Sequence, residues 1–465
     1  MQFTTYSFII YMILFISLWN RVGGRRILLL NLSSLVFYGA WNPYYIFLMV
    51  GSSGIDYFCG LAMDRWRRYD RWLLWSALSA NIGVLIFFKY TQFLHAVWCD
   101  LSVILPITCT GNAPSILLPV GISFYTFQSM AYSIDVYRKE IEPCRNPNEY
   151  FCYISLFPQL VAGPIERASH LIPQIRRLTQ LSALPLEWRE SGSLILRGII
   201  KKCVVADHLA SYVDPVFTKM SDYSLLSIVV ATLFFSVQIY CDFSGYTDIA
   251  RGLARMIGIR LMENFNYPYN AISIREFWHR WHISLSTWLR DYLYISLGGS
   301  KKGSFRTSCN LMITMILGGI WHGASYNFLL WGGYYGLMLI LERAEWCRLP
   351  VRIPDPLRWL MTMLLVGFGW FIFRMETIAD LGVLGWRLKT IMWNSGIHLV
   401  PNLLTVGAFL LFLSVTLLEL KILRRKIMPF CVTEPWKRRL VVGTVLAIYY
   451  LAAPSMDRMF IYFQF

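Results

Sequence analysis

One titratable side chain, His322, lies in the long apolar stretch 311–341, which contains no other Asp, Glu, Lys, Arg or His. A charged group at the centre of a membrane-spanning helix costs about 2.5–3.5 kcal/mol or more, so an ionisable residue there usually faces a cavity or a partner. Removal from water favours the neutral imidazole, the form that can accept a proton from a hydroxyl group. Gly318, Gly319 and Gly323 would let a ligand or a second backbone approach closely. We predict that His322 is catalytic; the alternative is a neutral histidine that only links two helices.

Two further histidines lie in the segment 274–297, where apolar residues recur at the three- and four-residue spacing of one helix face. This spacing predicts a single amphipathic helix rich in Trp and Arg, of the kind that lies at a membrane interface. His282 falls at the edge of the apolar stripe and His279 falls well into the polar face, so His282 is the better functional candidate. The alternative is two ordinary interfacial histidines. We expect no metal site, because no carboxylate or cysteine partner is evident for the pair.

The segment 157–167 is an apolar run that two prolines and a glycine interrupt. Such residues break a helix, and irregular backbone at membrane depth is tolerated only inside protein or beside a cavity. The pattern predicts either a re-entrant element, in which Glu166 and Arg167 could pair, or a loop at the membrane surface.

The segment 240–255 places Asp242 and Asp248 just after a predicted span. Asp248 and Arg251 have the three-residue spacing of a pair on one helix face, so an ion pair is favoured over catalysis for them. The following residues, 264–269, form a turn-rich aromatic connector that leads into the predicted amphipathic helix.

The composition indicates a membrane protein. Of 465 residues, 56% are hydrophobic and 15% are charged, whereas a soluble domain has about 25% charged residues. The net charge of +16 comes from basic residues in short runs between apolar segments. Short basic loops stay on the cytoplasmic side of a membrane. We therefore expect lipid as the surrounding partner and do not expect nucleic acid binding.

The apolar segments predict an all-α polytopic membrane protein with about ten to twelve crossings, because a span needs about 20 apolar residues. The segment 1–465 reads as a single domain, since no long polar stretch divides it. Basic runs on both sides of the hairpin 27–63 place its Asn42-Pro43 tip outside the cell. The predicted spans are 4–19, 27–41, 43–63, 72–89, 117–136, 147–162, 192–206, 224–241, 305–321, 323–341, 358–374, 402–420 and 439–454.

Ten cysteines are scattered along the chain without a CxxC pair, which argues against a metal or redox centre. Cys99 and Cys109 share one connection with a polar tip. A disulfide between these two residues is a hypothesis that a mass shift of the peptide on reduction would test.

Several ordered motifs resemble the membrane-bound O-acyltransferase (MBOAT) family, and within it the bacterial alginate O-acetyltransferase branch. The motifs run from about residue 117 to the last residue, and only Ser296, where Pro is common in the family, departs from the pattern. They are FPQLVAGPIER, YCDFSGYTDIARGLARMIGI, NFNYPYNAISIREFWHRWHISLSTWLRDYLYISLGGSKKG, GGIWHGASYNFLLWGGYYG, GWFIFRMETIADLG and FIYFQF.

The resemblance implies a helical core with re-entrant elements and interfacial amphipathic helices around a central tunnel. It assigns the family's invariant histidine to His322 and its second histidine to His282. An acyl thioester such as acetyl-CoA would be the donor, with no bound cofactor, and a polysaccharide outside the cytoplasm would be the acceptor. A periplasmic or membrane-anchored SGNH-type transferase would be the partner, and the bacterial inner membrane the location. We predict that these motifs also contribute substrate contacts from Trp321, Asn327, Trp281, Arg280 and Asp242.

Three other functions stay open at this stage. D-alanyl transfer to teichoic acid is the closest, because enzymes of that reaction belong to the same superfamily. A transporter predicts several intramembrane charges and often internal repeats, and neither is evident. A scaffold without chemistry offers no reason for a histidine within a glycine-containing apolar run.

Overall fold

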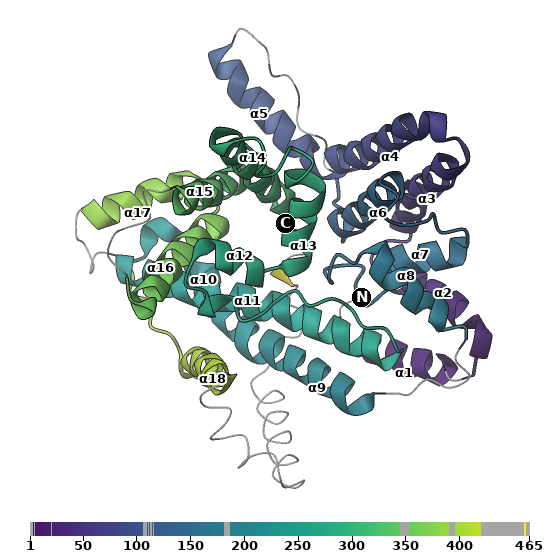
Figure 1. The fold of residues 1–465 in the computed structure, drawn as a ribbon. Helices are drawn as coiled ribbons and strands as arrows, with labels where there is room; N and C mark the ends of the chain where they lie inside the picture. The colour runs from purple at the N-terminus through teal and green to yellow at the C-terminus, as the bar shows by residue number, and fades with distance from the viewer. Residues whose placement is uncertain are drawn as a thin grey trace, which may run out of the picture.

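The fold is all-helical over the described part of the chain, with one isolated bridge between Tyr223 and Ile397. The computed structural model describes residues 3, 5–19, 21–105, 109, 111, 114, 116–180, 187–344, 353–389, 396–419 and 460–461. Its α-helices are α1 Tyr6–Trp19, α2 Arg26–Gly39, α3 Tyr44–Arg65, α4 Asp70–Leu85, α5 Thr91–Ile104, α6 Ile122–Tyr137, α7 Pro147–Ser155, α8 Ala168–Arg177, α9 Trp188–Ile199, α10 Asp207–Thr218, α11 Leu225–Met256, α12 Ile274–Arg280, α13 Ile283–Trp288, α14 Ser304–His322, α15 Tyr326–Arg343, α16 Asp355–Arg374, α17 Ala379–Lys389 and α18 Leu403–Glu419 (Figure 1).

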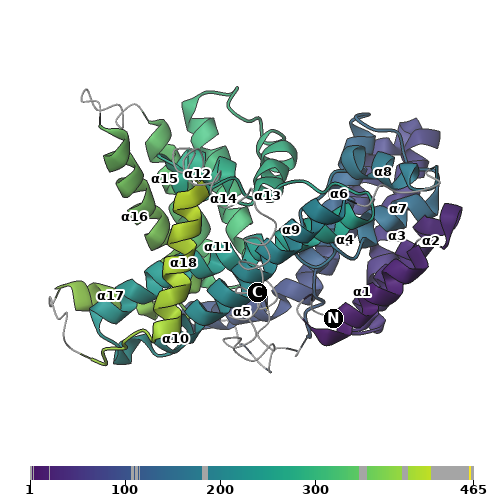
Figure 2. The same ribbon diagram turned by 90° about the horizontal axis from the view of Figure 1, so that it is seen from below.

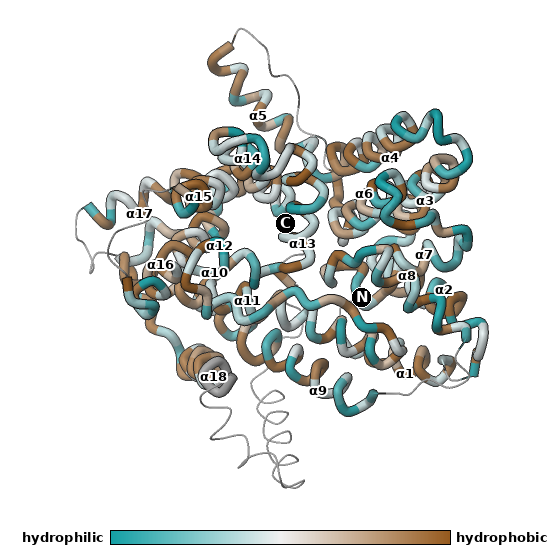
Figure 3. The backbone as a smooth tube through the Cα atoms, in the orientation of Figure 1, coloured by the Kyte–Doolittle hydropathy of each residue, from teal (hydrophilic) through white to brown (hydrophobic). Residues whose placement is uncertain are grey.

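Lipid-facing helices explain why so many large apolar side chains are exposed. Phe47 on α3, Trp72 on α4 and Leu364 on α16 are exposed, which would be costly in water but not in a bilayer. Hydrophobic residues run along α18 and hydrophilic residues gather at the connection from α3 to α4 (Figure 3). Of the described helices, four are long and apolar enough to cross a membrane, namely Tyr44–Arg65, Arg67–Ile104, Leu225–Met256 and Asp355–Arg374. The protein is therefore a membrane protein, while the larger number of crossings stays a prediction and the segment 439–454 lies outside the described residues.

Two hydrophobic cores share the long helix α11. One core lies among α1–α4 and α6–α8, and the other lies among α10, α12, α15 and α16. Figures 1 and 2 show these two groups of helices on opposite sides of the molecule, with α11 running between them. Phe235 in the first half of α11 belongs to the second core, and Phe243 in its middle belongs to the first.

The prediction of one continuous helix over 274–297 is wrong. Helix α12 ends at Arg280, and α13 begins at Ile283. His282 stands between them in the left-handed backbone conformation, with φ 42°. Backbone from the preceding connector stabilises the break, because the Asn264 carbonyl accepts a hydrogen bond of 2.9 Å from the Ile283 N–H. The helix period alone cannot reveal a break that a distant loop stabilises.

The segment 157–167 is an irregular buried element, so the surface-loop alternative is wrong for it. Two serine hydroxyls accept its backbone N–H groups, Ser34 from Phe157 at 3.1 Å and Ser284 from Ile165 at 3.0 Å. These bonds meet the requirement that buried backbone polar groups have partners. The segment thereby packs between α2 and α13.

Glu166 and Arg167 do not pair with each other. The fully buried Glu166 accepts hydrogen bonds from the Met262 N–H and from His170, the latter at 2.6 Å. Arg167 instead forms an ion pair with Asp291 at 3.3 Å. The hydrogen bond to Glu166 raises the pKa of His170 above its ordinary value.

Candidate active site

His322 is the last residue of α14 and is 6% exposed. Three aromatic rings surround its imidazole edge-on, with centroid distances of 5.0 Å to Trp321, 5.1 Å to Trp331 and 5.5 Å to Phe373. These rings come from α14, α15 and α16, so three helices build the walls around one histidine. Such apolar walls lower the local dielectric and strengthen any electrostatic interaction with a bound reactant.

Glycines allow α14 and α15 to approach closely beside this histidine. A Cβ added to Gly319 would lie 3.0 Å from the Cα of Gly332, and one added to Gly332 would lie 2.8 Å from the Cα of Ile316. Both distances are shorter than ordinary carbon contacts, so neither position has room for a side chain. The glycines beside His322 therefore bring two backbones together, which is one of the two functions that the sequence left open for them.

His282 is fully buried and caps α13. Its Nδ1 accepts a hydrogen bond of 3.3 Å from the Leu285 N–H. Its ring lies 4.7 Å from Phe243 and 6.4 Å from Phe124, measured between centroids. A non-glycine residue with a left-handed backbone costs about 1–3 kcal/mol, and such residues cluster at functional sites.

The two histidines are 40 residues apart in the sequence, and both rings contact the indole of Trp321. The centroid of Trp321 lies 6.1 Å from that of His282 and 5.0 Å from that of His322. The structure thus assembles the two predicted catalytic residues in one place, with Trp321 beside both.

A cavity of about 700 Å³ leads to His322. Its inner part contains His322, Gly318 and Trp331, and its outer part contains exposed basic side chains. His322 therefore faces neither lipid nor solid packing, but a space with a charged mouth. The lining residues at the mouth are Arg275, His279, Arg290, Glu342 and Arg343.

His279 and Trp331 are site residues that the sequence reasoning ranked low or missed. His279 lines the cavity although the helical-wheel argument preferred His282, which is not among the described lining residues. Trp331 stands nine residues after His322 in the sequence. Only the glycine-mediated approach of α15 to α14 brings this ring against the imidazole, so no local pattern could have found it.

Three other predicted substrate contacts, Asn327, Trp281 and Arg280, do not line this cavity. Asn327 donates a hydrogen bond of 2.8 Å to the Met375 carbonyl. Trp281 is buried against Trp370, at a centroid distance of 4.7 Å. Arg280 forms an ion pair of 2.7 Å with Glu276 on its own helix. Their observed contacts are thus with protein groups, and substrate binding by them stays a prediction.

Asp242 is part of a buried ion-pair cluster, away from the cavity lining. It lies 2.5 Å from the Lys202 ammonium and accepts a hydrogen bond of 2.8 Å from the Ile461 N–H. Lys202 also pairs with Asp207 at 2.9 Å. These contacts tie α11 to Ile461, and the substrate contact predicted for Asp242 stays a prediction.

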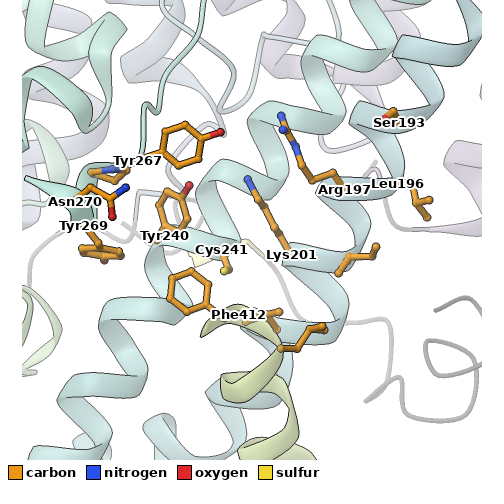
Figure 4. Close-up of a pocket in the computed structure, with 14 residues that line it drawn as sticks. Ser193, Leu196, Arg197, Lys201, Tyr240, Cys241, Tyr267, Tyr269, Asn270 and Phe412 are labelled. Carbon is orange, nitrogen blue, oxygen red and sulfur yellow. The ribbon is translucent and has the colours of Figure 1, made fainter. Parts of the chain in front are cut away.

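A second, smaller cavity of about 270 Å³ lies beside α9 and α11 (Figure 4). Arg197 and Lys201 line it, and both form ion pairs of 2.8 Å with Asp248. Arg251 lies farther from this carboxylate, at 3.8 Å. The predicted Asp248–Arg251 pair is therefore present, but the closer cations come from another helix.

Cys99 and Cys109 form a disulfide in the structure, with their Cα atoms 5.1 Å apart. His95 lies next to them, with its Nδ1 3.7 Å from the Cys99 sulfur. The potential metal-binding atoms of His95, Cys99 and Cys109 lie within 4.8 Å of one another. Because the sulfurs are bonded to each other, they offer no thiolate to an ion in this state.

The fold and the site define a helical membrane protein with a buried histidine at the inner end of a basic-mouthed cavity. Residues 145–375 match MBOAT, the membrane-bound O-acyltransferase family. The chain is 40% identical over 391 residues to "Probable alginate O-acetylase AlgI" of Pseudomonas aeruginosa, covering 82% of this chain and 72% of that protein. It is 34% identical to a peptidoglycan O-acetyltransferase of Helicobacter pylori, over 76% of this chain and 71% of that one. A teichoic acid D-alanyltransferase of Bacillus subtilis is 26% identical, over 60% of this chain and 74% of that one.

The chain therefore belongs to the membrane-bound O-acyltransferase family and is an acyltransferase.

Proposed function

We propose that this protein takes an acetyl group from a thioester donor in the cytoplasm and passes it to a polysaccharide hydroxyl outside the cytoplasm. The cavity that joins a basic mouth to His322 is the observation that carries this proposal. The two more similar relatives described above are named for O-acetylation of alginate and of peptidoglycan, which favours an acetyl group and a polysaccharide acceptor.

Charge and depth support donor entry from the cytoplasm. The mouth of the cavity includes Arg275, Arg290 and Arg343, and basic residues mark the cytoplasmic side. A mouth of this charge also suits the phosphates of a donor such as acetyl-CoA. His322 lies sixteen residues after Arg306 on α14, which is about 24 Å of helix. A small acyl group at the end of a long thioester arm can reach that depth through the cavity.

In the proposed reaction, the neutral imidazole of His322 lies next to the acyl carbonyl of the donor. His322 takes the proton of the acceptor hydroxyl as that oxygen forms a bond to the acyl carbon. The carbon–sulfur bond then breaks, and the proton passes to the departing thiolate, which leaves as a free thiol. A cavity that holds donor and acceptor together makes their reaction effectively unimolecular. This proximity supplies much of the rate acceleration in such transfers. In this proposal His282 orients the acyl group or relays the proton, next to Trp321.

A partner protein completes the proposed pathway. The described chain is helical and lipid-facing, with no soluble domain to hold an extended glycan. An SGNH-type transferase on the outer side would present the hydroxyl that accepts the acyl group, and would then transfer that group to a hydroxyl of the polymer. The proposed pathway requires a location in the bacterial inner membrane.

Replacement of the central histidine tests the proposal. We expect His322→Ala to lower acetyl transfer by about 10²–10⁴-fold, the usual contribution of a general base. The measurement is release of free thiol from acetyl-CoA by proteoliposomes, together with acetyl content of the cell's polymer. His398→Ala, at an exposed histidine that does not line the cavity, is the matched control and should retain most of the transfer. Undiminished acetylation by His322→Ala at normal protein level would remove this residue from the mechanism.

The transferred group is decided by mass analysis of the modified polymer. A mass increase that corresponds to an acetyl group supports the proposal. A mass increase that corresponds to D-alanyl would contradict it and favour the reaction for which the Bacillus relative is named. Transport without thiol release would instead favour a transporter.

A further inference from the structure

Lys89 places its ammonium group at the end of the helix that carries His322. It lies in a π-helical turn, Ile86–Tyr90, between α4 and α5. Its Nζ donates to the Trp321 carbonyl at 2.5 Å and to the His322 carbonyl at 3.3 Å. It also lies 3.4 Å from the Ser123 hydroxyl oxygen, on α6.

The carbonyls that Lys89 contacts are those that a helix cannot satisfy by itself. The last four C=O groups of an α-helix have no partner within the helix, and the helix dipole makes this end negative. A third terminal carbonyl, that of Ile320, accepts a hydrogen bond of 3.1 Å from the Tyr90 hydroxyl. Two consecutive residues of one turn thus bind the last three residues of α14.

The same cation contacts the indole that lies beside both histidines. The Lys89 Nζ lies 5.8 Å from the centroid of the Trp321 ring, within the range of a cation–π interaction. Its hydrogen bonds hold the backbone of Trp321 and His322, and its charge faces the Trp321 ring. The direction of the His322 side chain depends on that backbone, because α14 ends there and the next residue, Gly323, is extended.

We infer that Lys89 is a positioning residue of the acyltransferase, which holds the His322 imidazole in its reactive orientation by capping the last carbonyls of α14. The inference rests on the proposed function of His322. It assigns the π-helical turn Ile86–Tyr90 to the site, although no residue of this turn lines the described cavity. We expect a loss of this cap to tilt the end of α14 rather than to weaken donor binding, because the turn does not line the cavity that the donor would enter.

The distinguishing test is a comparison of kcat with KM. We expect Lys89→Met to lower kcat for thiol release from acetyl-CoA by about 10- to 100-fold, since a displacement of about 1 Å can cost 10²-fold. We expect KM to stay within about twofold, because the lost interaction is not with the ground-state donor. Lys89→Arg keeps the charge and the donors, so it should recover most of kcat.

Two controls separate positioning from general stability. Arg26 is a buried cation that donates to the Leu178 carbonyl at 3.2 Å, in the core of the N-terminal helices. Arg26→Met should lower the melting temperature in detergent without a selective loss of kcat. Tyr90→Phe removes one neighbouring hydrogen bond and keeps the cation, so it should have a smaller effect than Lys89→Met.

Three results would overturn the inference: an unchanged kcat in Lys89→Met, a kcat in Lys89→Arg as low as in Lys89→Met, or an equal loss of kcat in Arg26→Met. If Lys89→Met does not accumulate, Lys89→Gln, which keeps a donor without the charge, is measured against the same criteria. His322→Ala is assayed in parallel. An inactive His322→Ala beside a fully active Lys89→Met contradicts the Lys89 inference alone, whereas an active His322→Ala contradicts the proposed function.

Discussion

His282 shows how one residue can have both a backbone role and a proposed chemical role. Its left-handed φ and its Nδ1 hydrogen bond with the Leu285 N–H start α13. Its ring also packs against Phe243 and Trp321. Any substitution of His282 therefore changes the helix start as well as the site, and a loss of activity by itself would not separate the two.

Asparagine at this position separates the two roles. It tolerates the left-handed backbone and its side-chain oxygen can cap a helix. We expect His282→Asn to keep its melting temperature in detergent and to lower acetyl transfer by about 10²-fold, the low end of a general acid–base contribution. His282→Ala should lose stability as well, by about 0.5–2 kcal/mol for the missing cap. Full transfer by His282→Asn would restrict His282 to the backbone role.

The local sequence predicted which histidines are important more reliably than it predicted the residues that contact them. The apolar run identified His322 without any structure, because an ionisable side chain there is costly. It gave no sign of Lys89, which is 233 residues away and meets His322 only through tertiary packing. The partner of Glu166 was also mispredicted, since His170 and Met262 come from elements that the spacing of Glu166 and Arg167 does not reveal.

At the scale of elements, the crossing of α14 and α15 controls the position of His322, the predicted catalytic histidine. Gly332 faces α14 at a point where a Cβ would meet the backbone of Met315 and Ile316, whereas a Cβ on the next residue, Gly333, would meet nothing within 4 Å. Adjacent glycines on one helix thus provide a crowded position and an open one.

We expect Gly332→Ala to force the two helices apart, at a cost of about 1–3 kcal/mol for overpacking. The shift also moves Trp331 relative to His322, so acetyl transfer should fall with stability. Gly333→Ala is the control and should be neutral or stabilising by up to about 1 kcal/mol, because it only removes backbone freedom. Melting temperature in detergent and thiol release measure the two effects. Equal behaviour of the two variants would contradict the close packing at Gly332.

The break between α12 and α13 is the element-scale feature that the sequence pattern missed. The apolar spacing over 274–297 is real, but it continues across a residue with a left-handed backbone. Asn264 stabilises that break, because its backbone and side-chain oxygens accept hydrogen bonds from the Ile283 and Ser284 N–H groups. Because Asn264 lies in a connector outside the periodic segment, the period could not indicate where the helix stops.

At the scale of the molecule, Phe460 and Ile461 join the two cores. Phe460 is buried in the core of the N-terminal helices, and Ile461 is buried in the core of the C-terminal helices. Lys202 lies 4.5 Å from the centroid of the Phe460 ring, and Tyr246 packs edge-on against it at 4.8 Å. Two adjacent residues therefore bridge the halves that surround the site.

We expect Phe460→Ala to destabilise the protein by about 3–5 kcal/mol, the usual cost of removing a buried aromatic ring. The measurement is the melting temperature in detergent, with protein level in membranes as a second readout. Phe305, whose exposed fraction is 83%, provides the control, and Phe305→Ala should have little effect. A small effect of Phe460→Ala would mean that the two cores hold together without this bridge.

The sequence alone determined the helical class, the apolar segments and the family resemblance, and it singled out His322 as the predicted catalytic residue, because these depend on composition and on short-range spacing. Tertiary structure decided the cavity, the meeting of two histidines on Trp321, the buried partner of Asp242 and the cap from Lys89. The two histidines and the Asp242–Lys202 pair each join residues forty positions apart, and the cap from Lys89 joins residues more than two hundred positions apart. No local period records such contacts, since they arise only when separate helices pack and must satisfy one another's buried polar groups.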